Sequence, residues 1–319
     1  MKALITGGAG FIGSHLADHL LAAGHQVIAL DNLSTGRHGN IEHLIGRPDF
    51  EFALGSILNA DLVDDVVGRA DVVFHLAAAV GVDLIVRKPV ESLRTNILGS
   101  EIVIEKAHKY GRPTLVTSTS EIYGKNTSDL LGEEDDRILG SPLKSRWSYS
   151  EAKAIEEILA YTYWKEKGLP TVIVRLFNTV GPRQVGHYGM VVPRFVNQAL
   201  RGEPITVYGD GSQTRCFVHV ADVVPALSTL IVTSEAHGRV FNLGGTDEIS
   251  IRDLAERVIA LTKSPSSIRT IPYEEAYETG FEDMARRMPD TTRIREAIGW
   301  TQSRDLDEII LSVIEEQRS

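Results

Sequence analysis

The sequence predicts an α/β protein with a doubly wound parallel sheet and a smaller C-terminal substrate-binding domain. Two features of the chain point to this fold class. Short apolar segments alternate with segments of helical periodicity through the first half of the chain, as in parallel sheets covered by helices. From Asn178 onward, loops lengthen and glycine and proline become more frequent. We therefore expect one domain over residues 1–177 and a second over 178–319, with the chain returning to the first around 216–242.

The N-terminal segment contains a strand, a glycine-rich turn, a helix and a second strand in immediate succession. Lys2–Thr6 and Gln26–Leu30 are short apolar runs suited to buried parallel strands. Between them, the glycine turn Gly7–Gly13 leads into an apolar-periodic helix over Phe11–Leu21. The second strand ends in Asp31. This order of elements is the context that a dinucleotide-binding turn requires.

Individual positions of this segment suit the binding of a dinucleotide. Gly7 permits the tight turn, Gly10 lets the backbone approach a pyrophosphate at the helix N-terminus, and Gly13 allows close helix–strand packing. Asp31 can accept hydrogen bonds from the adenosine ribose hydroxyls, and its charge would repel a 2′-phosphate. We therefore predict NAD as the cofactor. NADP is the minor alternative, because Arg37 lies close to Asp31 in the sequence.

The rest of the first half continues the alternation of strands and helices. The expected strands are Asp71–Leu76, Pro113–Ser118 and Thr171–Leu176, and the expected helices are Val90–Lys109 and Tyr149–Lys167. The small residues Ala77–Ala79, directly after a strand, would let a cofactor lie close to the backbone. Near the C-terminus, the amphipathic segment Leu306–Ile314 predicts a last helix.

The composition excludes several classes of protein. The 319 residues carry a net charge of −10, so neither nucleic acid nor an anionic membrane is an expected partner. Cys216 is the single cysteine, which rules out an intramolecular disulfide and a cysteine metal cluster. His15 and His19 share a helix face, but no further ligand suggests itself, so we expect no metal site.

Neither a membrane span nor a targeting segment is apparent. No apolar run reaches the roughly 18 residues of a membrane span. Met1 leads directly into the first expected strand, which leaves no room for a signal peptide. We therefore expect a cytoplasmic protein.

A second group of residues suggests acid–base chemistry. Tyr149 and Lys153 are four residues apart on an expected helix and therefore share one face. A tyrosine is a weak base at its reference pKa of about 10, and a neighbouring lysine cation favours the phenolate and moves that pKa toward neutrality. Such a phenolate can take a proton from a sugar hydroxyl while the sugar carbon gives a hydride to the nicotinamide.

These motifs together resemble the extended short-chain dehydrogenases/reductases, in particular their nucleotide-sugar epimerase, dehydratase and decarboxylase group. The resemblance covers nearly the whole chain. Its landmarks are Gly7/Gly10/Gly13, Asp31-Asn32, His75-Leu-Ala-Ala78, Asn96, the Thr119 region, Tyr149/Lys153, Arg175-Leu-Phe-Asn178, Gly181-Pro-Arg183 and Val207–Arg215. It implies a Rossmann fold, NAD as cofactor and a UDP-sugar as substrate.

The resemblance also implies roles for individual residues. Tyr149 would be the base, Lys153 would hold the nicotinamide ribose, and Thr119 would hydrogen-bond the sugar O4. Ser120 and Glu121 complete the expected catalytic set. The expected cofactor contacts are Gly7, Gly10, Phe11, Ile12, Gly13, Asp31, Asn32, Ser34, Gly36, Ser56, Leu76, Ala77, Ala78, Asn96, Tyr149 and Lys153. The expected substrate contacts are Asn178, Arg183, Val192, Tyr208, Arg215 and Arg287.

The family also implies a homodimer. In this arrangement the Val90–Lys109 and Tyr149–Lys167 helices pack against their mates as a four-helix bundle. Apolar residues outside a single helical stripe, such as Ala154, Ile158 and Tyr161, are consistent with such an interface.

Two positions depart from the pattern of the family. The family usually has Gly-Asp after the third strand, with the Asp on the adenine amine, whereas this chain has Gly55-Ser56. Ser56 can still accept a hydrogen bond, although adenine would be held less tightly or by the backbone. Cys216 stands where relatives often carry another small or acidic residue, and we expect it to be buried and not a nucleophile.

Members of the group share the removal of a hydride from C4 and differ in the step that follows. A 4,6-dehydratase usually has Thr-Asp-Glu where this chain has Thr119-Ser120-Glu121, so the acid that would protonate a departing C6 hydroxyl is absent. A 4-epimerase needs Tyr149, Lys153, Thr119 and room for the ketose to turn over.

Decarboxylation of UDP-glucuronate is the leading prediction. A ketone at C4 and a carboxylate on C5 form a β-keto acid, which loses carbon dioxide readily because the electrons delocalise into the ketone. Thr119–Glu121 and Arg146–Tyr149 resemble motifs of UDP-glucuronate decarboxylases and UDP-apiose/xylose synthases, and Arg287 resembles an arginine near the reacting sugar. The loop from Asn178 to Phe195 departs from theirs. A UDP-glucose or UDP-glucuronate 4-epimerase is therefore the alternative, and a non-catalytic NAD-binding protein is a remote one.

Overall fold

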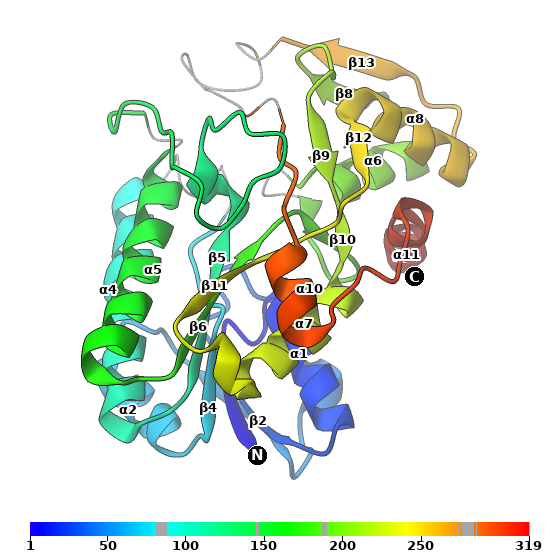
Figure 1. The fold of residues 1–319 in the computed structure, drawn as a ribbon. Helices are drawn as coiled ribbons and strands as arrows, with labels where there is room; N and C mark the ends of the chain where they lie inside the picture. The colour runs from blue at the N-terminus through cyan, green and yellow to red at the C-terminus, as the bar shows by residue number, and fades with distance from the viewer. Residues whose placement is uncertain are drawn as a thin grey trace.

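The computed structural model is organised around a parallel sheet of seven strands, in the order β11-β6-β5-β4-β1-β2-β3 (Figure 1). These strands are β1 (Lys2–Thr6), β2 (Gln26–Asp31), β3 (Phe50–Leu54), β4 (Val72–His75), β5 (Thr114–Thr119), β6 (Thr171–Leu176) and β11 (Arg239–Leu243). The structure describes residues 1–80, 88–144, 147–186, 190–272, 275, 284 and 286–318. The predicted doubly wound α/β fold is confirmed.

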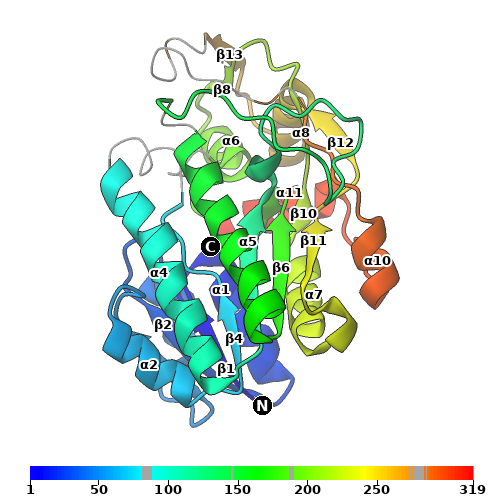
Figure 2. The ribbon, with the colours of Figure 1, turned by 60° about the vertical axis from the view of Figure 1, so that its left-hand side comes forward.

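Helices cover both faces of this sheet. On one face lie α2 (Ala60–Gly68), α4 (Pro89–Tyr110) and α5 (Ser148–Lys167), and on the other lie α1 (Phe11–Ala22), α7 (Val220–Val232) and α10 (Thr292–Ile298). The sheet residues are buried against apolar side chains from each layer, such as Leu16 of α1 and Val103 of α4. Figure 2 shows α4 and α5 side by side in front of the sheet. Because the strands are parallel, their carboxyl ends all lie at one edge of the sheet, where ligands bind in such folds.

Local sequence signals explain where the long helices begin and end. Pro89 stands in the first turn of α4, where its missing N–H costs no hydrogen bond. Gly111 and Gly168 end α4 and α5 in the left-handed conformation, with φ angles of 62° and 70°. The bounds predicted for these two helices agree with the structure to within one residue at each end.

A second lobe has its own hydrophobic core and lies beyond the carboxyl edge of the sheet. Its helices are α6 (Val191–Leu200), α8 (Ile251–Thr262) and α11 (Leu306–Arg318), whose apolar faces pack together. Its strands pair as β8 (Ile205–Tyr208) with β13 (Ile268–Ile271), and β9 (Thr214–Cys216) with β12 (Glu248–Ser250). Between the lobes, β7 (Thr179–Val180) pairs with β10 (Val218–His219). The short 3₁₀ helices are η1 (His38–Asn40), η2 (Glu42–Leu44), η3 (Ser120–Tyr123) and η6 (Ser234–Ala236).

The second half of the chain contributes to both lobes. Within residues 216–242, α7 packs on the sheet, and β11 begins at Arg239 and pairs with β6 at the sheet edge. Farther along, α10 packs against β11 and α7. The division into a cofactor-binding unit (1–177) and a substrate-binding unit (178–319) stays a proposal about which half holds which ligand.

The described residues lack two features, a membrane-spanning helix and a metal-binding cluster. None of their helices is long and apolar enough to cross a membrane. They also contain no group of three or more His, Cys, Asp and Glu side chains arranged to hold a metal ion.

Candidate functional site

A cavity of about 590 Å³ lies at the carboxyl edge of the sheet, with walls from both lobes. All residues predicted for catalysis and for substrate binding line this cavity. The predicted cofactor contacts line it as well, with the exception of Gly36 and Asn96. Residues from distant parts of the chain, such as Gly10 and Arg287, therefore border one space.

The glycine turn is shaped so that side chains would not fit. Gly7 has a φ angle of +72°, and a Cβ there would lie 2.9 Å from the backbone nitrogen of Ala77. A Cβ on Gly13 would lie 2.1 Å from the carbonyl oxygen of Gly7. Gly10 is the N-cap of α1 and supplies no side chain, so the first N–H groups of this helix are open toward the cavity. This cradle fits the pyrophosphate of NAD.

Asp31 lies at the end of β2 and is held by backbone donors. Its Oδ2 accepts a hydrogen bond from Ala9 N at 3.0 Å, and its Oδ1 accepts one from Leu33 N at 2.8 Å. Burial raises the pKa of this carboxyl, and the backbone donors act in the opposite direction. A carboxylate has about four acceptor sites, so acceptor capacity is left for ribose hydroxyls. The position of Asp31 therefore suits NAD.

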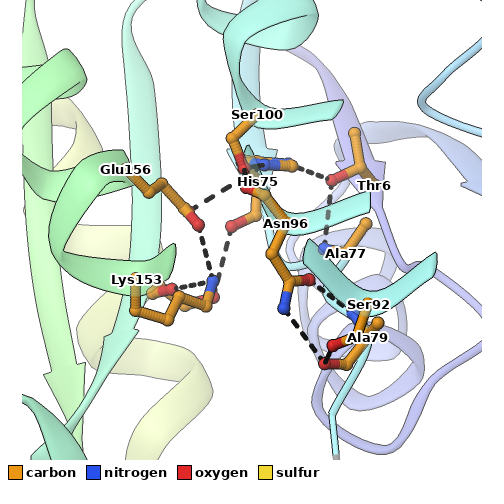
Figure 3. A network of polar contacts seen from close by, with 10 residues as sticks. Thr6, His75, Ala77, Ala79, Ser92, Asn96, Ser100, Lys153 and Glu156 are labelled. Atoms are coloured by element: carbon orange, nitrogen blue, oxygen red, sulfur yellow. Dashed lines mark hydrogen bonds and ion pairs between the residues drawn. The ribbon is translucent and has the colours of Figure 1, made fainter. Parts of the chain in front are cut away.

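Gly36 and Asn96 support the cofactor site from behind. A Cβ on Gly36 would lie 2.8 Å from Asp31 Oδ2, so glycine lets the loop pass close to this carboxylate. Asn96 is buried in α4; its Oδ1 accepts from Ala79 N at 2.7 Å and its Nδ2 donates to Ala79 O at 3.1 Å (Figure 3). Gly36 and Asn96 thus lie next to Asp31 and Ala79, which line the cavity, and their contact with the cofactor stays a prediction.

The residues expected to act on the sugar lie where β5 ends. Thr119 Oγ1 accepts a hydrogen bond from Glu121 N at 3.2 Å, which fixes the turn into η3. Arg287 approaches from the segment before α10, with its Nη1 3.4 Å from Ser120 Oγ and 3.8 Å from Glu121 Oε1. The cavity therefore has a guanidinium and a carboxylate side by side next to Thr119.

Lys153 is buried and makes two strong contacts inside the protein. Its Nζ donates to Thr117 O at 2.7 Å and to Glu156 Oε2 at 2.8 Å. Burial raises the pKa of Tyr149, and the carboxylates of Glu121 and Glu156 add to this effect. The sequence predicted the opposite direction for Tyr149, because it took the lysine charge as unopposed. In the structure, Glu156 opposes that charge.

The substrate end of the cavity is rich in cationic and aromatic side chains. Arg183 Nη2 pairs with Asp18 at 2.8 Å, while its buried Nη1 has no hydrogen-bond partner among the described residues. Arg215 is a buried residue of β9, and its Nη1 donates to Thr214 O at 2.8 Å. The Tyr208 ring faces the Arg194 guanidinium at 4.3 Å from its centroid. Such an arrangement can bind a diphosphate and an aromatic base.

Ser56 and Cys216 are the two positions that depart from the pattern of the family. Ser56 lines the cavity, and its Oγ accepts a hydrogen bond from Leu58 N at 3.2 Å, so its own O–H remains as a donor. Cys216 is fully buried, and burial raises the pKa of its thiol to about 12. A thiol in that state is a poor nucleophile, in agreement with the expectation. Asn178 Nδ2 donates to the backbone oxygen of Cys216 at 2.8 Å.

Some predicted features fall outside the described residues, and some site residues were not predicted. Arg146 of the Arg-Trp-Ser-Tyr motif and residues 187–189 of the substrate loop lie outside the described part of the chain. Ser118, whose buried Oγ has no partner among the described residues, lines the cavity but was not predicted. Glu156 was also missed, although a glutamate three positions after Lys153 is visible in the sequence.

Comparison with known proteins agrees with this geometry. Residues 3–244 match the model of the NAD dependent epimerase/dehydratase family. The chain is 43% identical to a UDP-N-acetyl-alpha-D-glucosaminuronate decarboxylase of Bacillus cytotoxicus, over 92% of this chain and 91% of the relative. It is 37% identical to UDP-glucuronic acid decarboxylase 1 of Danio rerio, over 96% of this chain and 70% of the relative.

A solved structure is also similar over the whole length. The UDP-glucuronic acid 4-epimerase of Bacillus cereus, in complex with UDP-glucuronic acid and NAD, superposes with a TM-score of 0.89 and 28% identity. The similarity covers 100% of this chain and 99% of that one.

Proposed function

The chain belongs to the NAD dependent epimerase/dehydratase family, and from this premise we propose that it decarboxylates a UDP-hexuronate after oxidation at C4. The observation that carries the proposal is the pairing of Arg287 with Glu121 beside Thr119. Both decarboxylase relatives described above act, by their names, on UDP-sugars with a uronate group. A 4-epimerase of the kind found among the structural neighbours is the alternative.

Arg287 has the chemistry to bind a sugar carboxylate. Its side chain is 10% exposed, and its cationic Nη1 lies near Ser120 Oγ and Glu121 Oε1 inside the cavity. A guanidinium matches the two oxygens of a carboxylate with parallel hydrogen bonds. The neighbouring Glu121 would repel that carboxylate if both were charged. The arrangement therefore favours loss of the sugar carboxylate as carbon dioxide, which is the outcome of a decarboxylation.

The first chemical step depends on Tyr149, Thr119 and Lys153. Tyr149 takes the proton of the C4 hydroxyl, and Thr119 orients that hydroxyl through a hydrogen bond to O4. NAD, held by the glycine cradle, Asp31 and Lys153, supplies the acceptor for the C4 hydride and its later donor.

The second step starts from the ketone at C4. The carboxylate on C5 is then β to a carbonyl, so carbon dioxide leaves and its bonding electrons delocalise into the ketone. Glu121 relays a proton to C5, while Arg287 holds the carboxylate until it leaves as carbon dioxide. Return of the hydride to C4 and of the Tyr149 proton to O4 would complete the cycle with a UDP-pentose as product.

A comparison of substrates tests this function. The purified protein is incubated separately with UDP-glucuronate, UDP-N-acetylglucosaminuronate and UDP-glucose in D2O, and the products are followed by NMR. We expect a pentose product, release of carbon dioxide and deuterium at C5 with one of the uronates. A product inverted at C4, with neither carbon dioxide nor deuterium at C5, would reject the decarboxylase and favour the epimerase.

We further propose that the protein is a homodimer in the cytoplasm. On α5, Ile158 is 62% exposed, and Tyr161 and Trp164 are exposed as well, which supports an apolar contact with a second copy. Ala154 was expected in this interface, but it is buried against a cluster that contains Tyr123 and Phe177. The interface is therefore proposed for the outward face of α5 and the adjacent α4.

A further inference from the structure

A buried carboxylate lies behind Lys153, and the proposed reaction does not use it. Glu156 is three residues beyond Lys153 on α5, so both side chains lie on one helix face. Each side chain is 2% exposed, and Lys153 Nζ donates to Glu156 Oε2 at 2.8 Å. Figure 3 shows this pair enclosed between α5, α4 and the sheet. Because burial of a carboxylate is costly without a partner, the contact must serve Lys153 or its surroundings.

The second oxygen of Glu156 faces a histidine that is neutral. His75 Nε2 lies 3.9 Å from Glu156 Oε1, and desolvation lowers the pKa of His75 to about 3. Ser100 Oγ donates its proton to Asn96 O at 2.7 Å, so it can only accept from His75 Nε2, and the Thr6 hydroxyl then donates to His75 Nδ1 at 2.7 Å. His75 therefore carries its proton on Nε2 and donates to Ser100 Oγ at 2.9 Å. His75 therefore forms hydrogen bonds with Thr6 and Ser100 but places no positive charge next to Glu156.

The remaining ionisable groups around the pair are also accounted for. On α5, Tyr149 lies toward the cavity, and Glu157 pairs with Arg175 through two hydrogen bonds of 2.9 and 2.8 Å. After burial, the Glu121 carboxylate of η3 is the next influence that raises the pKa of Tyr149. Lys153 is the cation in direct contact with Glu156. Burial raises the pKa of Glu156, and the charge and hydrogen bond of Lys153 act in the opposite direction and favour the carboxylate.

We propose that Glu156 is a positioning residue for the C4 oxidation: it holds the Lys153 ammonium in place and neutralises its charge, so Tyr149 works in a less positive field. The ammonium has three N–H donors, and Thr117 O and Glu156 Oε2 take two of them. One donor then remains for a ligand in the cavity that Lys153 lines. The carboxylate fixes which way that last donor can point.

This arrangement has a consequence for pH. The Glu156 carboxylate is one of the charges that raise the pKa of Tyr149, after burial and Glu121. A base must be deprotonated to act, so the rate of C4 oxidation rises as pH passes the pKa of Tyr149. Without the Glu156 charge, no carboxylate in direct contact offsets the positive charge of Lys153. The Lys153 cation then favours the Tyr149 phenolate, so the rate of C4 oxidation should begin to rise at a lower pH.

The test is Glu156→Gln, which keeps the size and an oxygen acceptor for Lys153 but removes the charge. The first readout is the ultraviolet titration of the Tyr149 phenolate with NAD present, obtained by subtracting the titration of Tyr149→Phe made in the same background. The second is the pH dependence of NADH formation in a single turnover with the UDP-sugar. We expect both midpoints to fall by about half a unit to one unit.

Two further variants separate charge from position. Glu157→Gln removes a neighbouring buried charge that does not touch Lys153, so its midpoints should match the wild type. Glu156→Asp keeps the charge but shortens the reach to Lys153, so its midpoints should stay while the maximal rate falls. If Glu156→Gln does not fold, a shifted midpoint in Glu156→Asp contradicts the proposal by itself.

The outcomes distinguish this inference from the proposed function, whose C4 oxidation step it uses. The phenolate titration needs no substrate, so it gives an answer even if the protein acts on none of the sugars tested. Unchanged midpoints in Glu156→Gln, or an equal shift in Glu157→Gln, would overturn the role of Glu156. Decarboxylase and epimerase activity are both compatible with the expected shift.

Discussion

Glu121 Oε1 lies 3.8 Å from Arg287 Nη1, and these residues reach the cavity from segments far apart in the sequence. Glu121 belongs to η3 directly after β5, whereas Arg287 precedes α10 in the second half of the chain. In the proposed reaction, this contact joins the residues assigned to C4 oxidation to the arginine assigned to the sugar carboxylate. It is the point at which a decarboxylase and an epimerase would differ most.

Glu121→Gln should separate the two candidate reactions. The change is nearly isosteric and removes the ionisable group, while Tyr149, Lys153 and Thr119 remain for hydride transfer. Loss of the Glu121 charge also removes one of the influences that raise the pKa of Tyr149, so C4 oxidation should persist. For a decarboxylase, we expect NADH to accumulate with UDP-glucuronate and carbon dioxide release to fall by about 10²-fold or more.

The matched control for this variant is Glu151→Gln. Glu151 lies on α5, is half exposed and pairs with Arg137 at 3.2 Å, away from the sugar. It should behave as the wild type in NADH absorbance and carbon dioxide release. Full activity of Glu121→Gln would count against decarboxylation, since an epimerase breaks no bond to the C5 substituent.

Tyr149→Phe keeps the ring and removes the hydroxyl that accepts the C4 proton. Turnover should fall by roughly 10²–10⁴-fold, the usual contribution of a general base. NAD affinity, measured by calorimetry, should change little because Lys153 keeps its contacts with Thr117 and Glu156. Near-normal turnover would remove Tyr149 from the mechanism.

The parts of the site that are contiguous in sequence could be predicted, and those assembled by packing could not. Gly7–Gly13 and Asp31 follow one another in a strand–turn–helix–strand unit, so their spacing alone indicates a dinucleotide site. Glu156, by contrast, looks like a solvated helix residue in the sequence. It is buried only because α4 and β4 pack against the same face of α5.

Packing of elements that are distant in the sequence also explains what could not be predicted for Ala154 and Asn96. Ala154 was assigned to an interface from helix periodicity, but it is buried by side chains from η3 and the segment after β6. In the same way, the hydrogen bonds of Asn96 to Ala79 could not be predicted, because they depend on how α4 packs against the segment after β4. Periodicity indicates which residues share a face, whereas the structure shows what covers that face.

Ile158→Glu should break the proposed homodimer. Ile158 is 62% exposed on α5, next to the exposed rings of Tyr161 and Trp164, and a buried unpaired charge in such an interface is costly. We expect a dimer for the wild type and a monomer for the variant by light scattering at micromolar concentration. Val232→Glu is the control, since Val232 is 61% exposed on α7 at the other face of the sheet. A monomeric wild type would refute the dimer.

Asp31→Ala should weaken NAD binding more than NADP binding. The carboxylate suits ribose hydroxyls and repels a 2′-phosphate, so its loss costs NAD a favourable contact and relieves NADP of an unfavourable one. The change also removes the acceptors of Ala9 N and Leu33 N, which costs about 1–3 kcal/mol for each donor left unpaired and buried. Dissociation constants for both cofactors are therefore compared at a temperature where thermal melts show the variant to be folded.

Arg37→Ala tests the alternative that the cofactor is NADP. Its backbone N donates to Ala9 O at 3.0 Å, which keeps Arg37 near Asp31, while its side chain is exposed. If the cofactor is NAD, removal of this side chain should leave NAD affinity unchanged. The assignment of Asp31 would be wrong if the wild type prefers NADP and Arg37→Ala loses that preference, because the guanidinium would then be the group that recognises the 2′-phosphate.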